Sequence, residues 1–178
     1  MTIEDIVSMD QSVPVDMWVK AAQATVRRFC GWHIAPSITE TVQVTAHGGR
    51  RMNLPSGHVT RIMEISFRGR ALDPATDIDW SPEGAVMLRR ELPDWPDVPG
   101  GVSATITHGW AVEEVPEVVA LIASIAQRAS ASPAAIASQA VNGASVTFRT
   151  SNGAPLGVPL LQVEKDQLAP FAIGRKVT

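Results

Sequence analysis

The sequence predicts an α+β fold: a helical scaffold of N-terminal, central Ala-rich and C-terminal helices, with an inserted antiparallel β-sheet or small barrel. Apolar residues recur at spacings of three and four from Val15 to Phe29, as on one face of a helix. After Pro36 the period changes to two, as in a half-buried strand. A second apolar helix follows Pro116. The expected parts are helical regions 1–35 and 112–178 and a β-rich insertion 36–111, within a single domain, 1–178.

The first strong helix is expected to begin after Pro14 and to end near Cys30. Arg27 and Arg28 lie in its last turn, where cations interact favourably with the helix dipole. Gly31 stands where a helix-terminating residue with positive φ is expected. The helix therefore ends sharply and leads directly into the β-rich insertion.

The insertion is expected to contain six or seven short strands. Alternation from Ile38 to Thr45 predicts the first strand, and the Gly-rich turn at 46–49 predicts a hairpin whose second strand is 51–54. Leu92–Gly101 contains three prolines and two glycines, which predicts an irregular surface loop. Further strands are expected at 59–67, 70–72, 78–80, 85–88 and 102–106.

The helix that starts at Pro116 is apolar around most of its circumference, so we expect it to be the central and most buried helix. Ser145–Arg149 alternates around Val146 and Phe148 and predicts an isolated strand with no partner nearby in the sequence. An unpaired strand edge can pair with another subunit. Pro159 can start a last helix, which ends at Pro170.

Composition excludes several classes of protein. An apolar content of 45% in 178 residues is sufficient for a core, and no apolar run reaches the roughly 18 residues of a membrane span. The acidic start at Glu4 and Asp5 is not typical of a secretory signal. Cys30 is the only cysteine, so an intrachain disulfide or a thiolate metal cluster is excluded.

Charge alternates in blocks along the chain, although the net charge is only −3. The balance is negative over 1–19, positive over 20–70, negative over 71–120 and positive over 121–178. One interpretation is ordinary surface patchiness. The other is a self-complementary surface, in which a basic face of one subunit meets an acidic face of the next and closes a ring. The sequence lacks the net basic stripe of a dedicated nucleic-acid binder.

No catalytic, cofactor or metal motif is found. The four histidines lack the i,i+3 or i,i+4 spacing of ligands on one helix face, and no nucleophile elbow, phosphate loop or dinucleotide fingerprint occurs. A Ser/His/Asp catalytic set could be drawn from Ser56, His58 and Asp77, but nearly any chain of this size contains such a set. His33, just past a helix end, is expected to make a structural hydrogen bond. We therefore predict no enzyme activity, no cofactor, no metal and no catalytic residue.

Trp95 stands out because it lies in the proline-stiffened loop Leu92–Asp97. Either it folds back over the protein as a lid, or it is a rigid aromatic anchor that docks onto a neighbouring subunit, since Trp is enriched at interface hot spots.

Four stretches in fixed order carry a family resemblance. Arg27–Ser37 reads Arg-Arg-Phe-Cys-Gly-Trp-His-Ile-Ala-Pro-Ser, and it is followed by Leu54–Thr60, Asp77–Ser81 and Thr105–Trp110, the last running into the Ala-rich helix. Over roughly Val13 to Val146 the chain resembles the head–tail connector (adaptor) proteins of long-tailed bacteriophages, of the type that infect actinobacteria.

The resemblance implies a structural virion neck protein. Such a protein forms a homo-oligomeric ring, a dodecamer, beneath the portal protein and offers its far side to a stopper or tail-completion protein. Double-stranded DNA would pass through the ring without sequence-specific binding. The implied location is the neck at the head–tail interface of the virion, and the host cytoplasm during assembly, with no membrane partner.

Three groups of residues receive roles, the first by analogy with the family and the other two as hypotheses from the residues themselves. The assigned portal-docking residues are Phe171, Arg175 and Lys176; the inter-subunit or neck contacts are Trp95, Val146, Phe148 and Arg149; and Asp94 and Asp97 face the DNA lumen, where repulsion keeps DNA sliding. The prolines that crowd the C-terminal third depart from the more regular helix of relatives. The alternatives are another neck component, such as a stopper or tail-completion protein, or a small hydrolase or ligand-binding β-domain that uses His58 and His108.

Overall fold

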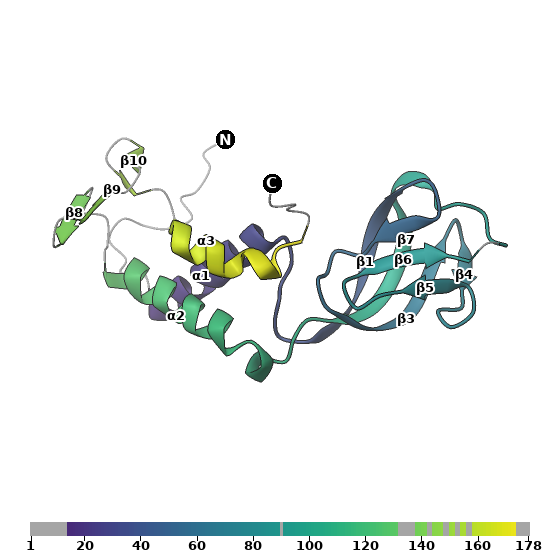
Figure 1. Ribbon diagram of the computed structural model, residues 1–178, viewed down its shortest axis with the longest axis horizontal. Helices are drawn as coiled ribbons and strands as arrows, with labels where there is room; N and C mark the ends of the chain where they lie inside the picture. The colour runs from purple at the N-terminus through teal and green to yellow at the C-terminus, as the bar shows by residue number, and fades with distance from the viewer. Residues whose placement is uncertain are drawn as a thin grey trace, which may run out of the picture.

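The computed structural model places the elements in two units, joined end to end in an elongated molecule (Figure 1). One unit is helical and the other contains strands β1–β7, so the α+β prediction is confirmed. None of the described helices combines the length and apolarity that a bilayer span requires. The structure describes residues 14–89, 91–131, 138–141, 144–147, 150–151, 154–155 and 158–173.

The first helix of the helical unit, α1 (Val15–Cys30), has the predicted bounds. It ends at Gly31, whose φ of 83° is left-handed and whose N–H donates to the Arg27 carbonyl, so the predicted termination is confirmed. The buried stripe of α1 is Ala22, Val26 and Cys30. Because these residues are three to four positions apart, they lie on one face and enter the core of the helical unit.

The second long helix, α2 (Pro116–Ala131), begins at the predicted proline and follows a 3₁₀ turn, η1 (Val112–Glu114). Its predicted central position is wrong. Its described buried residues are Val118, Ile125 and Ala126, whereas Val119 is 44% exposed. The backbone of α1 lies close to both α2 and the short helix α3 (Gln162–Leu168), which leads into the 3₁₀ turn η2 (Ala169–Phe171). Helix α2 reaches α3 through the side chain of Arg128.

The β unit consists of two open antiparallel sheets that share one core, so a closed barrel is not formed. The larger sheet has the order β1-β7-β3-β4, and the smaller has the order β2-β6-β5. The strands are β1 (Ile38–His47), β2 (Arg51–Asn53), β3 (Val59–Phe67), β4 (Arg70–Leu72), β5 (Ile78–Trp80), β6 (Ala85–Leu88) and β7 (Asp97–His108).

The predicted hairpin at 46–54 is wrong in its pairing, because β2 pairs with β6 of the smaller sheet. The long partner of β1 is β7, which runs antiparallel to it from the Ile38–His108 pair to the His47–Asp97 pair. The chain thus switches sheets at the glycine turn after β1. The strand predictions themselves are confirmed for β1 to β6.

The predicted loop 92–101 is too long, because β7 already begins at Asp97. Val44 pairs with Val102 and Ala46 with Val98, so the three residues 99–101 bulge opposite Thr45. The N–H of Gly100 donates to the Thr45 hydroxyl at 3.0 Å. This irregularity accommodates the Pro-Gly-Gly sequence within a long strand, since a bulge tolerates residues that a regular ladder does not.

The predicted isolated strand at 145–149 is also wrong. Strand β9 (Ala144–Thr147) pairs antiparallel with β8 (Ser138–Val141), as a hairpin between α2 and α3. Val146 lies opposite Gln139 in this hairpin. A second short pair, β10 (Thr150–Ser151) and β11 (Ala154–Pro155), follows it. Phe148 and Arg149 lie outside the described residues.

The chain crosses between the two units twice, and the two crossings lie side by side. After α1 it passes through Trp32 to Ala35, and after β7 it returns through Gly109 and Trp110. The Trp110 N–H donates to the Ile34 carbonyl at 2.8 Å, which ties the crossings together. Ile34 has a φ of 62° and is 1% exposed, so a β-branched residue is held there in a strained conformation by its surroundings.

Candidate functional site

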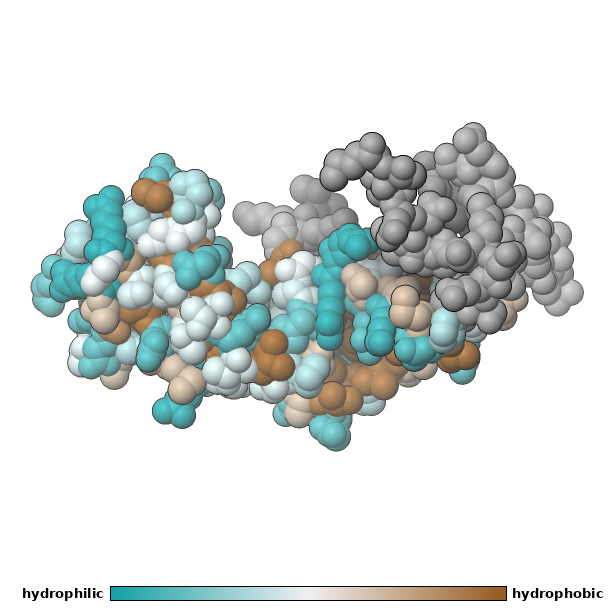
Figure 2. Space-filling model, turned by 180° about the vertical axis from the view of Figure 1, so that it is seen from behind, coloured by the Kyte–Doolittle hydropathy of each residue, from teal (hydrophilic) through white to brown (hydrophobic). Residues whose placement is uncertain are grey.

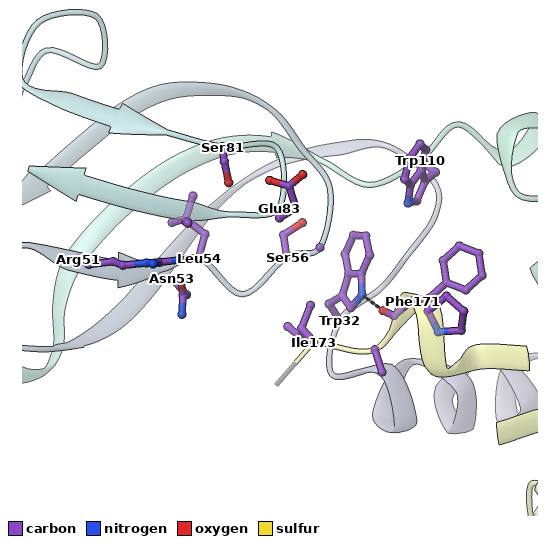
Figure 3. A pocket seen from close by; sticks show the side chains of 14 residues that line it. Trp32, Arg51, Asn53, Leu54, Ser56, Ser81, Glu83, Trp110, Phe171 and Ile173 are labelled. Carbon is purple, nitrogen blue, oxygen red and sulfur yellow. Dashed lines mark hydrogen bonds between the residues drawn. The ribbon is translucent and has the colours of Figure 1, made fainter. Parts of the chain in front are cut away.

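The junction between the two units contains an open cleft of about 640 Å³ (Figure 3). Trp32 lies on its helical side, and its indole N–H donates to the Phe171 carbonyl at 2.6 Å. Ser56 and Glu83 come from loops of the β unit. The cleft therefore lies between the end of the helical unit and the smaller sheet.

Three polar side chains meet on another part of the junction, which we call the junction triad: His33, Glu40 and His108. His33 follows α1, Glu40 is on β1, and His108 is the last residue of β7. The His108 Nε2 lies 3.1 Å from the Glu40 carboxylate, and the rings of His33 and His108 are edge to face with centroids 4.5 Å apart. Sequence spacing gives no sign of this cluster, because strand pairing and the helix exit bring its members together.

Hydrogen bonds and burial determine which ring nitrogens of the triad carry protons. The Pro36 carbonyl can only accept, so the Nε2–H of His33 donates to it at 2.8 Å, as the predicted structural bond. Burial, and then the charge of His108, lowers the pKa of His33 below its ordinary value. His33 is therefore neutral at pH 7. His108 is 2% exposed, and its Nδ1 has no hydrogen-bond partner among the described residues.

Position 109 requires glycine because a side chain would not fit beside the triad. Its φ is 96°, and a Cβ there would lie 2.5 Å from His33 Nε2 and 2.7 Å from the Pro36 carbonyl oxygen. The glycine thus allows the two crossings to approach each other closely.

Gly109→Ala should destabilise the fold by about 1–3 kcal/mol from the left-handed φ alone, and by more because of the overlap. The matched control is Gly69→Ala, since Gly69 has a φ of 73° with open space around it. The free energy of unfolding, measured in urea by circular dichroism, should fall further for the first variant than for the second. Equal losses would show that the crossings have room for a methyl group.

The structure corrects the assignment of Trp95 as a contact with another subunit. Trp95 is 2% exposed; its indole N–H donates to the Arg50 carbonyl at 3.0 Å, and its ring meets Phe67 edge to face. The folded-back alternative is the one observed. The loop thus contributes its tryptophan to the core of the β unit.

The other assigned residues are distributed as follows. Phe171 is half-buried and packs against the helical core, so it is not carried on a free tail. Its assignment to portal docking stays a prediction. Arg175 and Lys176 lie outside the described residues. Asp94 and Asp97 are exposed near the end of the β unit, where Asp97 lies 4.0 Å from His47. Their proposed place in a DNA lumen stays a prediction.

The Ser56–His58–Asp77 set is not assembled. The Ser56 hydroxyl accepts a hydrogen bond from the His58 backbone, and the His58 ring stacks on Trp110 with centroids 3.6 Å apart. The Asp77 carboxylate accepts from the backbone N–H of Asp73. His58 and His108, the pair considered for a hydrolase, have separate ring partners.

Sequence reasoning also missed a buried ion pair. Arg128 on α2 donates both terminal guanidinium nitrogens to the Glu164 carboxylate on α3. Glu164 is 4% exposed and also accepts from the N–H of Leu161, the N-cap residue of α3, at 2.7 Å. The only available signal was Glu164 at the start of a predicted helix, which does not indicate a partner 36 residues away.

Comparison with known proteins adds no relative. No family model and no curated protein sequence matches this chain.

Proposed function

We propose that this protein is a structural component of a virion neck, which assembles as a ring beneath the portal, links capsid to tail and extends the DNA conduit. The observation that carries the proposal is an apolar groove between α1 and α2, which we call the α1–α2 groove. It is a place where a second copy of the chain can dock. Its apolar lining includes Val19, Val26, Val115, Val119 and Ile122.

The groove is unusually apolar for an exposed part of a helical unit. Figure 2 shows hydrophobic side chains gathered along the lower edge of that unit, where α2 runs. Val119 is 44% exposed in the groove, and Val112, at its end, is 43% exposed. Contiguous apolar surface of this kind is typical of protein–protein contact. A ring contact would remove these side chains from water.

Charge on either side of the groove favours a second copy as the occupant. The α1 side carries exposed Arg27 and Arg28. The other side carries exposed Glu113 and Glu114 of η1, between the lining residues Val112 and Val115. A basic edge of one subunit can therefore meet an acidic edge of the next, which is a head-to-tail contact that closes into a ring. Arg27 and Arg28 belong to the positive block 20–70 of the sequence, and the glutamates belong to the negative block 71–120.

The direct test is electron microscopy of the purified protein mixed with the portal protein encoded by the same genome. We expect a ring added to one end of the portal. A monomer in solution would not contradict the proposal, because adaptors of the resembled family can oligomerise only on docking. Binding to a preformed adaptor ring and not to the portal would identify a stopper or tail-completion protein instead. Binding to neither would overturn the neck assignment.

Val119→Asp should abolish ring formation on the portal without unfolding the subunit. A charge in the α1–α2 groove would have to be desolvated in the contact, whereas in the isolated chain the 44% exposed position can keep it hydrated. We expect the free energy of unfolding to change by no more than about 0.5 kcal/mol.

Val163→Asp is the matched control for the groove substitution. Val163 is a 58% exposed valine on α3 and is not part of the groove lining. Rings counted by negative-stain microscopy should persist with this variant. If the Val119 variant formed rings as readily as the control, the groove would not be the contact between subunits.

A further inference from the structure

We infer that the junction triad of His33, Glu40 and His108 is a binding site for a divalent transition-metal ion, with Zn²⁺ as the expected occupant. One ligand atom from each residue lies within 4.8 Å of the others. Two imidazoles and one carboxylate are a common protein ligand set for zinc. This inference is independent of the proposed role in a virion neck.

The geometry of one pair already fits a shared ion. Two ligands bound to tetrahedral Zn²⁺ at 2.0–2.1 Å are about 3.3 Å apart. The His108 Nε2 and the Glu40 carboxylate oxygen are separated by 3.1 Å, which is close to this spacing. Zn²⁺ would take the place of the shared proton. The distances from His33 to the other two ligand atoms are at most 4.8 Å, so His33 has to move by no more than roughly 1.5 Å to reach the spacing expected in such a site.

The surroundings of His108 are a second, separate observation. The ring is 2% exposed, its Nδ1 has no partner among the described residues, and its only described hydrogen bond is to Glu40. A buried imidazole with an incomplete set of hydrogen bonds is costly, since buried polar groups are normally paired. Coordination through Nε2 would strengthen the one described contact that holds this ring, and Nδ1 would stay unpaired.

Access and charge also favour a cation. Glu40 is 48% exposed, so the triad opens to solvent on its side and leaves a coordination position for water. The carboxylate supplies one negative charge, and the His33 ring nitrogen that does not donate to Pro36 supplies a lone pair. The donation from His33 to the Pro36 carbonyl is the outer-shell bond that typically orients a metal-binding imidazole. Nitrogen and oxygen ligands favour Zn²⁺ over the hard cations Mg²⁺ and Ca²⁺.

The role of the ion follows from the origin of its ligands. His33 lies on the crossing that leaves the helical unit, whereas Glu40 and His108 belong to paired strands of the β unit. An ion at the triad would therefore fasten one unit to the other at the junction. We expect it to stabilise the junction and not to take part in a reaction.

The test uses the full chain without an affinity tag, stripped of metal with a chelator and titrated with Zn²⁺ by calorimetry. We expect one ion per chain and a raised melting temperature. Glu40→Gln is nearly isosteric and half-exposed, and should weaken binding at least about tenfold, since even outer-shell changes weaken metal affinity 10–100-fold. The matched control is His47→Ala, from the exposed histidine–aspartate pair at the other end of β1, and it should bind normally.

Each other outcome would overturn the inference. Absence of stoichiometric binding would show that the triad is only a hydrogen-bonded cluster. Equal affinity in the Glu40 variant, or loss of binding in the His47 variant, would place the ion elsewhere. If the Glu40 variant failed to fold, X-ray absorption of the zinc-loaded wild-type chain would decide. Two imidazoles in the first shell are expected, and a shell without imidazole would contradict the site.

Discussion

Trp95→Ala is expected to lower the free energy of unfolding of the β unit by about 3–5 kcal/mol, the usual cost of truncating a fully buried aromatic residue. Trp95 is 2% exposed and lies in the core shared by the two sheets. Truncation removes the ring contact with Phe67 and the indole hydrogen bond to the Arg50 carbonyl. It also releases the loop before β7, whose closest tie to the glycine turn is the bond from Trp95 N–H to the Gly49 carbonyl.

The measurement is urea unfolding followed by far-UV circular dichroism, because loss of a tryptophan alters fluorescence directly. Trp80→Ala provides the control: Trp80 is 37% exposed on β5, so its removal should cost less than about 1.5 kcal/mol. A Trp95 variant as stable as the Trp80 variant would indicate that the loop does not cover the core in solution. It would also restore the interpretation of Trp95 as an anchor for a neighbouring subunit.

Arg128→Ala is expected to destabilise the helical unit by about 3–5 kcal/mol, because it leaves the Glu164 carboxylate buried without its cation. Glu164 is 4% exposed, and its other described hydrogen bond comes from the Leu161 N–H. Arg128 also donates to the Pro159 carbonyl at 3.0 Å, so its loss breaks the contacts of α2 both with α3 and with the segment leading into α3. We expect α3 to detach first.

Two further variants separate burial from charge. Arg89→Ala removes the exposed pair with Asp79 and should cost less than about 1 kcal/mol. The double change Arg128→Met with Glu164→Leu should recover most of the lost stability, because apolar residues can replace a buried ion pair. Recovery should fall short by about 0.5–2 kcal/mol, since the capping bond to Leu161 is also lost. If Arg128→Ala cost no more than Arg89→Ala, the pair would be solvated in solution.

Local sequence patterns predicted the helices and strands well. They predicted poorly which strands pair with each other. The bounds of α1 follow from apolar spacing and from Gly31, and six strands follow from alternation and turns. The partner of β2 does not, because a three-residue strand carries no register information of its own. The sheet switch after β1 therefore could not be read from the Gly-rich turn, which fits a hairpin equally well.

The candidate site was less predictable than the fold for the same reason. His33, Glu40 and His108 have no common spacing, and they meet because β1 pairs with β7 next to the exit of α1. Trp95 was ambiguous since its loop contains residues typical of both a surface and an anchor. The ion pair of Arg128 and Glu164 joins two helices 36 positions apart, and sequence spacing alone indicates no such pairing.

The tied crossings have an evolutionary and practical consequence. The chain leaves the helices at Ile34 and returns to them at Trp110, and a backbone hydrogen bond joins these two residues. The intervening segment 36–109 is therefore a cassette whose two ends lie side by side. Such a cassette can be lengthened, exchanged or excised, and its flanks rejoined by a few glycines, with little loss of loop entropy in the remainder. Grafting a different β module at this point would change what the β end of the molecule presents while preserving the helical unit.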